Sequence, residues 1–319
     1  MSKRRLSEQQ RRRIEAAEER HRSGANVNGE EGLVIARFGR RVLVETAPDV
    51  RISATLRRRV QDPVAGDRVV LLRDGGQAVI EALLPRKTVI NRPNSQGKLR
   101  PIAANIDHLL VVVAPLPEAQ ANLVDRYLVA AHDAGMDVTL VVNKGDLLPE
   151  APAVARLADD YLELGHSVVI TDQHSDPDAA ALIPIIGDQT LALVGQSGVG
   201  KSSLIQRLLP DREIRIGDLS DAAGVGKHTT TAAALYHLPR GGQLIDSPGV
   251  REFHLGHLPL AAVAEGFVEF APLLGTCHFR DCSHEHEQGC AILDAHGRGE
   301  ISAARLASYR QIVASMETP

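Results

Sequence analysis

The feature that most constrains the fold of this chain is the glycine-rich stretch GQSGVGKSS at positions 195–203. It has the pattern G-x4-G-K-[ST], follows the apolar run TLALV and precedes the helical stretch SSLIQRLL. A strand, a glycine-rich turn and a helix in this order predict a phosphate-binding loop, whose backbone N–H groups surround phosphate oxygens. Lys201 is expected to neutralise the terminal phosphates, and Ser202 to bind Mg²⁺. The predicted loop residues are Gly195, Gln196, Ser197, Gly198, Val199, Gly200, Lys201, Ser202 and Ser203.

A second motif of nucleotide sites, Asn143-Lys144-Gly145-Asp146, lies upstream of this loop at the end of the apolar run VTLVV. The Asp146 carboxylate can accept hydrogen bonds from N1–H and the exocyclic amine of guanine, whereas adenine offers no matching pair of donors. Asn143 and Lys144 are expected to brace the base and the phosphate loop. Nucleotide sites form at the carboxyl ends of strands in α/β sheets, which is where this motif falls. The sequence therefore predicts GTP and GDP, rather than ATP, as ligands.

Two further elements follow the phosphate loop. Asp246-Ser247-Pro248-Gly249 comes directly after the apolar run QLI, so Asp246 is expected to hold Mg²⁺ through water and the Gly249 N–H to contact the γ-phosphate. Between them lies GVGKHTTT (224–231), in which Thr230, or else Thr231, is expected to bind Mg²⁺ only while the γ-phosphate is present. Such a segment would become ordered with GTP and relax after hydrolysis.

The order of these motifs is a circular permutation of the usual arrangement, in which the phosphate loop comes first. A sheet tolerates this change because each strand–helix unit packs as before and only the connections move. The strand after the NKGD motif should end in a turn that lies behind the guanine. Thr171, at the end of HSVVIT, is the candidate for that position.

Apolar runs alternate with helical stretches over 105–258, which predicts a doubly wound α/β domain. Before it, five short β-type runs over 31–84 predict a small barrel, OB-like or SH3-like. The barrel arginines could contact RNA phosphates, or they could simply be the charged surface of a packed barrel; Phe38 is the single aromatic residue available for base stacking. Residues 85–104 are rich in Pro, Asn and basic residues and predict an irregular linker. The arginines concerned are Arg37, Arg40, Arg41, Arg57, Arg58 and Arg59.

The three cysteines of the chain all fall in the C-terminal segment 259–319, for which we predict a small, mostly helical domain. The pattern Cys277-x4-Cys282-x-His284-x5-Cys290 supplies three thiolates and one imidazole, a set that suits tetrahedral Zn²⁺. Four protein ligands leave no open position, so the predicted site is structural. His278 and His286 are alternative donors to His284.

Charge is unevenly distributed along the chain. The formal net charge is −4, yet residues 1–22 carry eight Lys/Arg against four Asp/Glu. This composition predicts an arm over 1–30 that lacks fixed structure until it meets an anionic surface, or else a solvated tail without a partner. No apolar run reaches the roughly 20 residues of a membrane span, and no signal peptide follows the basic start. These features predict a cytoplasmic protein that does not contact membranes.

Taken together, the motifs resemble the circularly permuted, small-ribosomal-subunit-dependent GTPase A family (RsgA, also called YjeQ). The resemblance covers about residues 31–295, where PRKTVINRP, NKGD, GQSGVGKSSL, GKHTTT, LIDSPGVREF and the Cys/His cluster occur in family order. It implies an OB-fold, a permuted GTPase domain and a zinc domain with His284 as the fourth ligand. It also implies a role in late maturation of the small ribosomal subunit, with the subunit and its rRNA as partners and as stimulators of GTP hydrolysis.

The resemblance further implies which residues act in hydrolysis. Val250 is apolar, where many GTPases carry a glutamine that positions water nearby. Family analogy points instead to His228, beside the threonines, acting together with Lys201 and Thr230. A monomer is expected. Two other functions are compatible with parts of the sequence: an RNA-binding scaffold that binds GTP without hydrolysing it, and an ATP-driven RNA-remodelling enzyme, which Asp146 disfavours.

Overall fold

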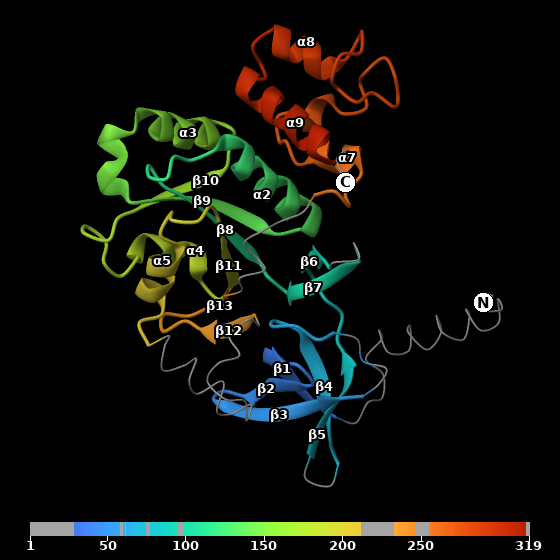
Figure 1. Cartoon of the computed structure of the whole chain (residues 1–319), viewed down its shortest axis with the longest axis vertical. Helices are drawn as coiled ribbons and strands as arrows, with labels where there is room; N and C mark the ends of the chain where they lie inside the picture. The colour runs from blue at the N-terminus through green and yellow to red at the C-terminus, as the bar shows by residue number, and fades with distance from the viewer. Residues whose placement is uncertain are drawn as a thin grey trace, which may run out of the picture.

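The structure is a computed structural model of the 319-residue chain, and it describes residues 29–57, 60, 62–74, 77–94, 98–211, 233–246 and 255–316. Figure 1 shows three parts: a barrel near the N-terminal end, a central sheet covered by helices, and a C-terminal group of helices beside α2. Within these ranges, no helix has both the length and the apolar character that crossing a membrane requires.

The N-terminal part is a five-stranded barrel, as predicted. Its strands pair in the order β1-β2-β3-β5-β4, and β4 pairs antiparallel with β1 to close the barrel. A closed five-stranded barrel of this kind is typical of the OB-fold. Inward-facing aliphatic side chains such as Val34, Val44 and Ile80 form its core, because alternate residues of each strand face the inside. The strands are β1 (Glu30–Phe38), β2 (Arg41–Ala47), β3 (Val50–Leu56), β4 (Arg68–Asp74) and β5 (Gln77–Leu83).

The connector after the barrel contains a hairpin that the sequence did not predict. Strands β6 (Val89–Pro93) and β7 (Leu99–Ala104) pair antiparallel, so the expectation of an irregular linker is wrong for these residues. Ile90 and Ala103 lie opposite each other, and both are buried in the central hydrophobic core. Their burial depends on the neighbouring domain, and such packing outweighs a local composition rich in Pro and Asn.

The central part is the predicted doubly wound α/β domain. Its strands lie in the order β10-β9-β8-β11-β13-β12, all parallel except β12. The β8 run HLLVVV is buried at every position, as expected for a strand covered on both faces. Figure 1 shows α2 and α3 on one face of the sheet and α4 and α5 on the other. The strands are β8 (His108–Val113), β9 (Asp137–Asn143), β10 (Ser167–Thr171), β11 (Thr190–Val194), β12 (Ala234–His237) and β13 (Gln243–Asp246). The helices are α2 (Ala121–Ala134), η1 (Gly145–Glu150), α3 (Pro152–Glu163), η2 (Ala180–Leu182), α4 (Ile183–Ile186) and α5 (Lys201–Leu208).

The barrel and the central domain share one continuous sheet. Strand β1 of the barrel pairs antiparallel with β12 of the central domain at Ala36 and Ala234, which gives an eleven-stranded sheet. The carboxyl ends of β8, β9, β10 and β11 meet at one edge of this sheet, and the nucleotide motifs follow these strands.

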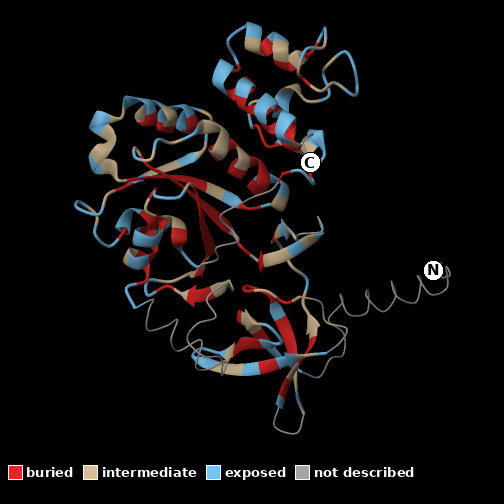
Figure 2. Ribbon diagram, in the orientation of Figure 1, coloured by how far each residue is buried: buried red, intermediate tan, exposed pale blue. Residues whose placement is uncertain are grey.

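The C-terminal part is small and mostly helical, as predicted. It comprises α7 (Leu260–Glu265), η4 (Ala271–Leu273), α8 (Ala291–Gly297) and α9 (Ala303–Met316). Phe267, Phe270 and Tyr309 are fully buried at its centre, with ring centroids 5.0–5.6 Å apart. This apolar cluster extends to Val129 and Ala130 of α2, so the C-terminal helices pack directly on the central domain. Figure 2 shows the buried faces of α2 and α9 turned toward each other.

Candidate functional site

The phosphate loop follows the fully buried strand β11 and leads into α5, which begins at Lys201. Gly195, Gly198 and Gly200 have positive φ angles of 136°, 87° and 95°. A Cβ atom on Gly195 would lie 2.1 Å from the Val112 carbonyl oxygen, and one on Gly200 would lie 2.3 Å from Asn143 Nδ2. The backbone conformation therefore favours glycine at all three positions, and close neighbours also require it at Gly195 and Gly200.

Asn143 of the NKGD motif joins three elements of the site. Its Nδ2 donates to the carbonyl of Val199 in the phosphate loop at 2.9 Å. Its Oδ1 accepts a hydrogen bond from Thr171 Oγ1 at 3.0 Å, and Thr171 lies opposite Asn143 in the β9–β10 pairing. The structure therefore brings Asn143, Thr171 and the phosphate loop into contact, although 56 residues separate Asn143 from Val199.

Lys144 makes a second connection to the phosphate loop. Its backbone is left-handed, with φ of 59°, and its Nζ donates to the carbonyls of Gly198 at 2.8 Å and Leu116 at 2.6 Å. Leu116, in the loop after β8, was not predicted as part of the site. The contact is made by its backbone oxygen, which every residue type carries, so the sequence gives no indication of it.

Asp146 is exposed in η1, next to the loop that follows β10. Its carboxylate, the Asp172 carboxylate and a His174 ring nitrogen all lie within 4.8 Å of one another. Gly145 permits this arrangement, since a Cβ there would lie 2.7 Å from Ile170 Cγ2. The Asp146 carboxylate therefore lies beside the loop after Thr171.

The phosphate end of the site lies at the start of α5. Lys201 is 7% exposed, and its Nζ donates to the carbonyls of Gly195 at 2.7 Å and Gln196 at 2.5 Å. Ser202 and Ser203 are exposed and, with Gln173, His174, Pro177, Gln206 and Arg207, line a cavity of about 560 Å³. Asp246 ends β13, the neighbour of β11, and so lies at the same edge of the sheet.

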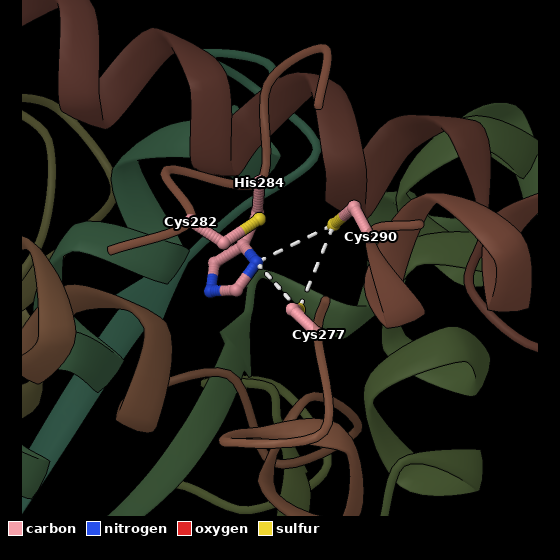
Figure 3. A group of neighbouring side chains, drawn as sticks. All are labelled: Cys277, Cys282, His284 and Cys290. Atoms are coloured by element: carbon pink, nitrogen blue, oxygen red, sulfur yellow. Dashed lines mark hydrogen bonds between the residues drawn. The ribbon is translucent and has the colours of Figure 1, made fainter. Parts of the chain in front are cut away.

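The C-terminal cluster brings together the four predicted metal ligands (Figure 3). His284 Nδ1 lies 3.5 Å from Cys277 Sγ and 3.4 Å from Cys290 Sγ, and these two sulfurs are 4.0 Å apart. Cys282 completes a group whose ligand atoms all lie within 4.8 Å of one another. A tetrahedral Zn²⁺ with bonds of about 2.0–2.3 Å separates its ligand atoms by about 3.5–3.8 Å. The Cys3His set therefore fits a zinc ion in both chemistry and spacing.

Burial affects the thiols of this cluster. Desolvation, together with hydrogen bonds that its thiol donates to Cys277 and Cys290, raises the pKa of Cys282 to about 12, and burial also raises the pKa of Cys290. A bound divalent cation stabilises the thiolate form, which is the form that ligates metal.

Glu287 organises the loop that carries His284. Its Oε1 accepts hydrogen bonds from the Ser283 N–H at 2.6 Å and the Ser283 hydroxyl at 2.5 Å. Its Oε2 accepts from the N–H groups of Glu285 and His286, both at 3.1 Å. His284 has a left-handed backbone, with φ of 64°, in the middle of this loop. Glu287 was not predicted from the sequence. Its position between the candidate ligands His284 and Cys290 was the one available signal.

The comparisons with known proteins agree with this geometry. Residues 83–256, more than half of the chain, match the family model for the RsgA GTPase. The chain belongs to the RsgA GTPase family.

Relatives and solved structures extend the likeness over the whole chain. A small ribosomal subunit biogenesis GTPase RsgA from Pseudomonas syringae pv. tomato is 48% identical over 89% of this chain and 85% of its own length. The protein of the same name from Chromohalobacter salexigens is 47% identical and covers 100% of both chains. The crystal structure of YjeQ from Thermotoga maritima matches 91% of this chain and 99% of its own, with a TM-score of 0.74 and 27% identity. YloQ, a circularly permuted GTPase, has the same fold, with a TM-score of 0.71 and 24% identity.

Several residues and one segment that the sequence analysis singled out lie outside the described part of the chain. These are His228, Thr230 and its alternative Thr231, and Gly249, together with the basic arm up to residue 28. Their roles remain predictions. Arg58 and Arg59 of the barrel also lie outside the described residues.

Proposed function

We propose that this protein is a GTP hydrolase that binds the small ribosomal subunit and acts in its late maturation. Membership of the RsgA family supports the activity, and the names of its relatives supply the partner. We further propose that it is a cytoplasmic monomer.

One observation carries the nucleotide-binding part of this proposal. Asn143 and Lys144 hydrogen-bond directly to the carbonyls of Val199 and Gly198 in the phosphate loop. These bonds tie the NKGD segment to the phosphate loop, which supports the proposal that one guanine nucleotide contacts both Asp146 and Lys201. In this arrangement, Asp146 reads the base, Thr171 supports Asn143 behind it, and residues 195–203 hold the phosphates.

We also assign residues that bind the two metal ions and the γ-phosphate. Mg²⁺ would offset the charge that develops on the phosphates, and Ser202, Asp246 and Thr230 would hold it. Lys201 would neutralise the terminal phosphates, the Gly249 N–H would contact the γ-phosphate, and His228 would position the attacking water. Zn²⁺ bound by Cys277, Cys282, His284 and Cys290 would stabilise the C-terminal fold.

The barrel surface refines the proposed RNA contact. Arg37 pairs with Asp62 at 3.1 Å and Arg57 with Glu81 at 2.5 Å, so part of the charge of these two arginines is offset within the protein. Arg40 and Arg41 are exposed at the turn between β1 and β2, and this turn is part of the arginine surface that we propose contacts RNA phosphates.

The decisive experiment measures GTP turnover with and without purified small ribosomal subunits, for the wild-type protein and for Lys201→Ala. We expect the subunits to raise turnover, and Lys201→Ala to lower the stimulated rate by about a hundredfold or more, since it removes the main protein charge at the transferred phosphate. Slow turnover that neither the subunits nor Lys201→Ala changes would instead identify a GTP-binding RNA scaffold. Competition of ATP against GTP distinguishes the remaining ATP-driven alternative.

The base preference has its own test. Xanthine carries a carbonyl where guanine carries the exocyclic amine, and an amide in place of the Asp146 carboxylate can donate to that carbonyl. Asp146→Asn should therefore weaken GDP binding and strengthen binding of xanthosine diphosphate. If Asp146→Asn binds both nucleotides as the wild type does, Asp146 does not read the base.

A further inference from the structure

Arg207, in the last turn of α5, is the link between the phosphate-loop helix and the loop after β10. Its Nε donates to the Pro177 carbonyl at 3.1 Å, and its Nη2 donates to the carbonyls of Asp172, at 3.4 Å, and Asp176. The Arg207 side chain is 11% exposed. One guanidinium thus holds three backbone oxygens of a single loop, largely shielded from water.

The loop itself is held together by its two aspartates. The Asp172 carboxylate accepts hydrogen bonds from the N–H groups of His174 at 2.9 Å and Ser175 at 3.3 Å. The Asp176 carboxylate accepts from the N–H groups of Ala180 at 2.7 Å and Ala181 at 3.2 Å, at the start of η2. Each aspartate fixes local backbone, whereas Arg207 fixes the position of the loop relative to α5.

The position of this loop matters because of what lies beside it. Asp172 follows Thr171, which bonds Asn143, and the Asp172 carboxylate lies within 4.8 Å of the Asp146 carboxylate. The same loop lines the cavity of about 560 Å³ together with Ser202 and Ser203 of α5. One side of the loop therefore faces the base-reading residue, and the other faces the start of the phosphate-loop helix.

We propose that Arg207 is a positioning residue for guanine recognition: it holds the backbone after Thr171 so that a main-chain N–H other than those bound to the Asp172 carboxylate meets O6 of the base. This inference rests on the proposed function. Asp146 accepts the donors N1–H and the amine, so it cannot read O6, which is an acceptor and needs an N–H partner. A loop tied to α5 keeps that partner at a fixed distance from the phosphate loop, so base and phosphates are bound in one geometry.

Arginine suits this task because its planar guanidinium offers several donors in fixed directions. A lysine would keep the charge, but its single ammonium could not serve the three carbonyls in the same geometry. Charge alone should therefore not replace Arg207.

The test compares GDP with the diphosphate of 2-aminopurine riboside, which keeps the exocyclic amine but lacks both O6 and the N1–H that accompanies it. Loss of the N1–H weakens the analogue in wild type and Arg207 variants alike, so a change in the ratio of the two dissociation constants between proteins reports on O6. The variants are Arg207→Ala and Arg207→Lys, with Arg240→Ala as the control. Arg240 pairs with Asp178 near the same loop at 3.1 Å, but through exposed side chains only. Dissociation constants and GDP release rates are measured with full-length protein, and thermal unfolding shows that each variant is folded.

We expect Arg207→Ala to weaken GDP binding about tenfold and to leave binding of the analogue nearly unchanged. The preference for GDP over the analogue should therefore fall by the same factor. Arg207→Lys should restore little of that preference, and it also serves as the test if Arg207→Ala does not fold. Arg240→Ala should behave as wild type.

An unchanged ratio between the two dissociation constants would overturn the inference, whether both affinities stay at the wild-type level or both fall equally; an equal fall would indicate a merely structural role. Lys201→Ala, measured in parallel, separates this inference from the proposed function. If wild type fails to bind GDP, or Lys201→Ala binds it equally well, the proposed nucleotide site itself is wrong. If Lys201→Ala loses GDP binding while Arg207→Ala keeps the wild-type ratio, only the inference is wrong.

Discussion

The central domain meets the barrel through hydrogen bonds of a shared sheet, whereas it meets the C-terminal domain through an apolar cluster and a buried ionic network. At the barrel junction, β1 pairs with β12, and Gly66 packs its backbone against Ala104 of β7 and Ile245 of β13. His237 of β12 also bonds the Glu45 carboxylate at 2.6 Å, with its side chain 39% exposed. Main-chain atoms make most of these contacts, and the side-chain pair of His237 with Glu45 is partly exposed to solvent.

The C-terminal junction depends on particular side chains. Arg305 of α9 donates to Glu269 at 2.6 and 3.0 Å and to Asp125 of α2, and its guanidinium lies 4.4 Å from the centroid of the Phe267 ring. Arg305 and Asp125 are both buried. Burial raises the pKa of Asp125, although the charge of Arg305 opposes this shift.

The difference teaches how each neighbour can respond to the central domain. Hydrogen bonds between paired strands are made by main-chain atoms, so a side-chain substitution leaves them in place. A buried ionic network has one good geometry, and a single lost partner leaves the others as uncompensated charges. We therefore expect the junction of α2 with the C-terminal domain to be more sensitive to side-chain substitution than the barrel junction.

The largest loss of stability should come from disrupting the Cys3His cluster, because this cluster supports the domain that carries Arg305. Cys290→Ser should abolish stoichiometric zinc and cost the C-terminal domain more than about 5 kcal/mol of folding free energy, since metal binding to such small domains is coupled to folding. Zinc content and limited proteolysis measure the outcome. His286→Ala, which removes a histidine outside the cluster, is the control. Equal zinc content and protease resistance in both variants would show that the buried network alone holds the domain.

The ionic network is the next largest test. Arg305→Met should destabilise the protein by about 3–5 kcal/mol, because Asp125 and Glu269 are left buried without their cation. Denaturant unfolding measures the change. Arg298→Ala removes a bidentate pair with Glu300 in which both side chains are 55% exposed, and should leave stability nearly unchanged because solvent screens exposed pairs. Similar costs for the two variants would contradict the contrast between the junctions.

Gly66→Ala tests the barrel junction by steric means. A Cβ on Gly66 would lie 2.0 Å from the Ala104 carbonyl oxygen, and the residue has a φ of 90°. We expect a loss of about 2–4 kcal/mol from the strained backbone and the displaced neighbour together. Gly39→Ala is the matched control, since Gly39 has a φ of 61° but a Cβ there would meet no atom within 4 Å. The loss of unfolding free energy in Gly66→Ala beyond that in Gly39→Ala measures the steric contact at the junction. Equal losses in the two variants would show that the backbone at the junction shifts to accommodate the Cβ at no cost.

Features that follow from local pattern were predictable from the sequence. The run HLLVVV is apolar throughout, and it forms a strand buried at every position. The phosphate loop is continuous in sequence, so strand, glycines and helix could be recognised together, and the four zinc-binding candidates lie within fourteen residues.

Features that depend on distant partners were not predictable. Arg305 and Asp125 are 180 residues apart, and nothing near either residue indicates the other. Arg207 looks like any basic residue in the last turn of a helix, and its role appears only once the loop after β10 is placed beside α5. The β6–β7 hairpin was missed for the same reason, because its strands are stabilised by burial of Ile90 and Ala103 against another domain.

The smallest effect is expected at the pair of His237 and Glu45. Glu45 is only 8% exposed, but Arg51 also contacts its carboxylate at 3.4 Å, so removing the imidazole does not leave the charge alone. His237→Ala should therefore cost about 1 kcal/mol or less. A double-mutant cycle with Glu45→Gln isolates the pair, and its coupling energy should be smaller than that of Arg305 with Glu269 measured in the same way. A larger coupling energy for His237–Glu45 would show that a side-chain pair, rather than strand pairing, holds the barrel against the central domain. Both junctions would then depend on ionic side chains.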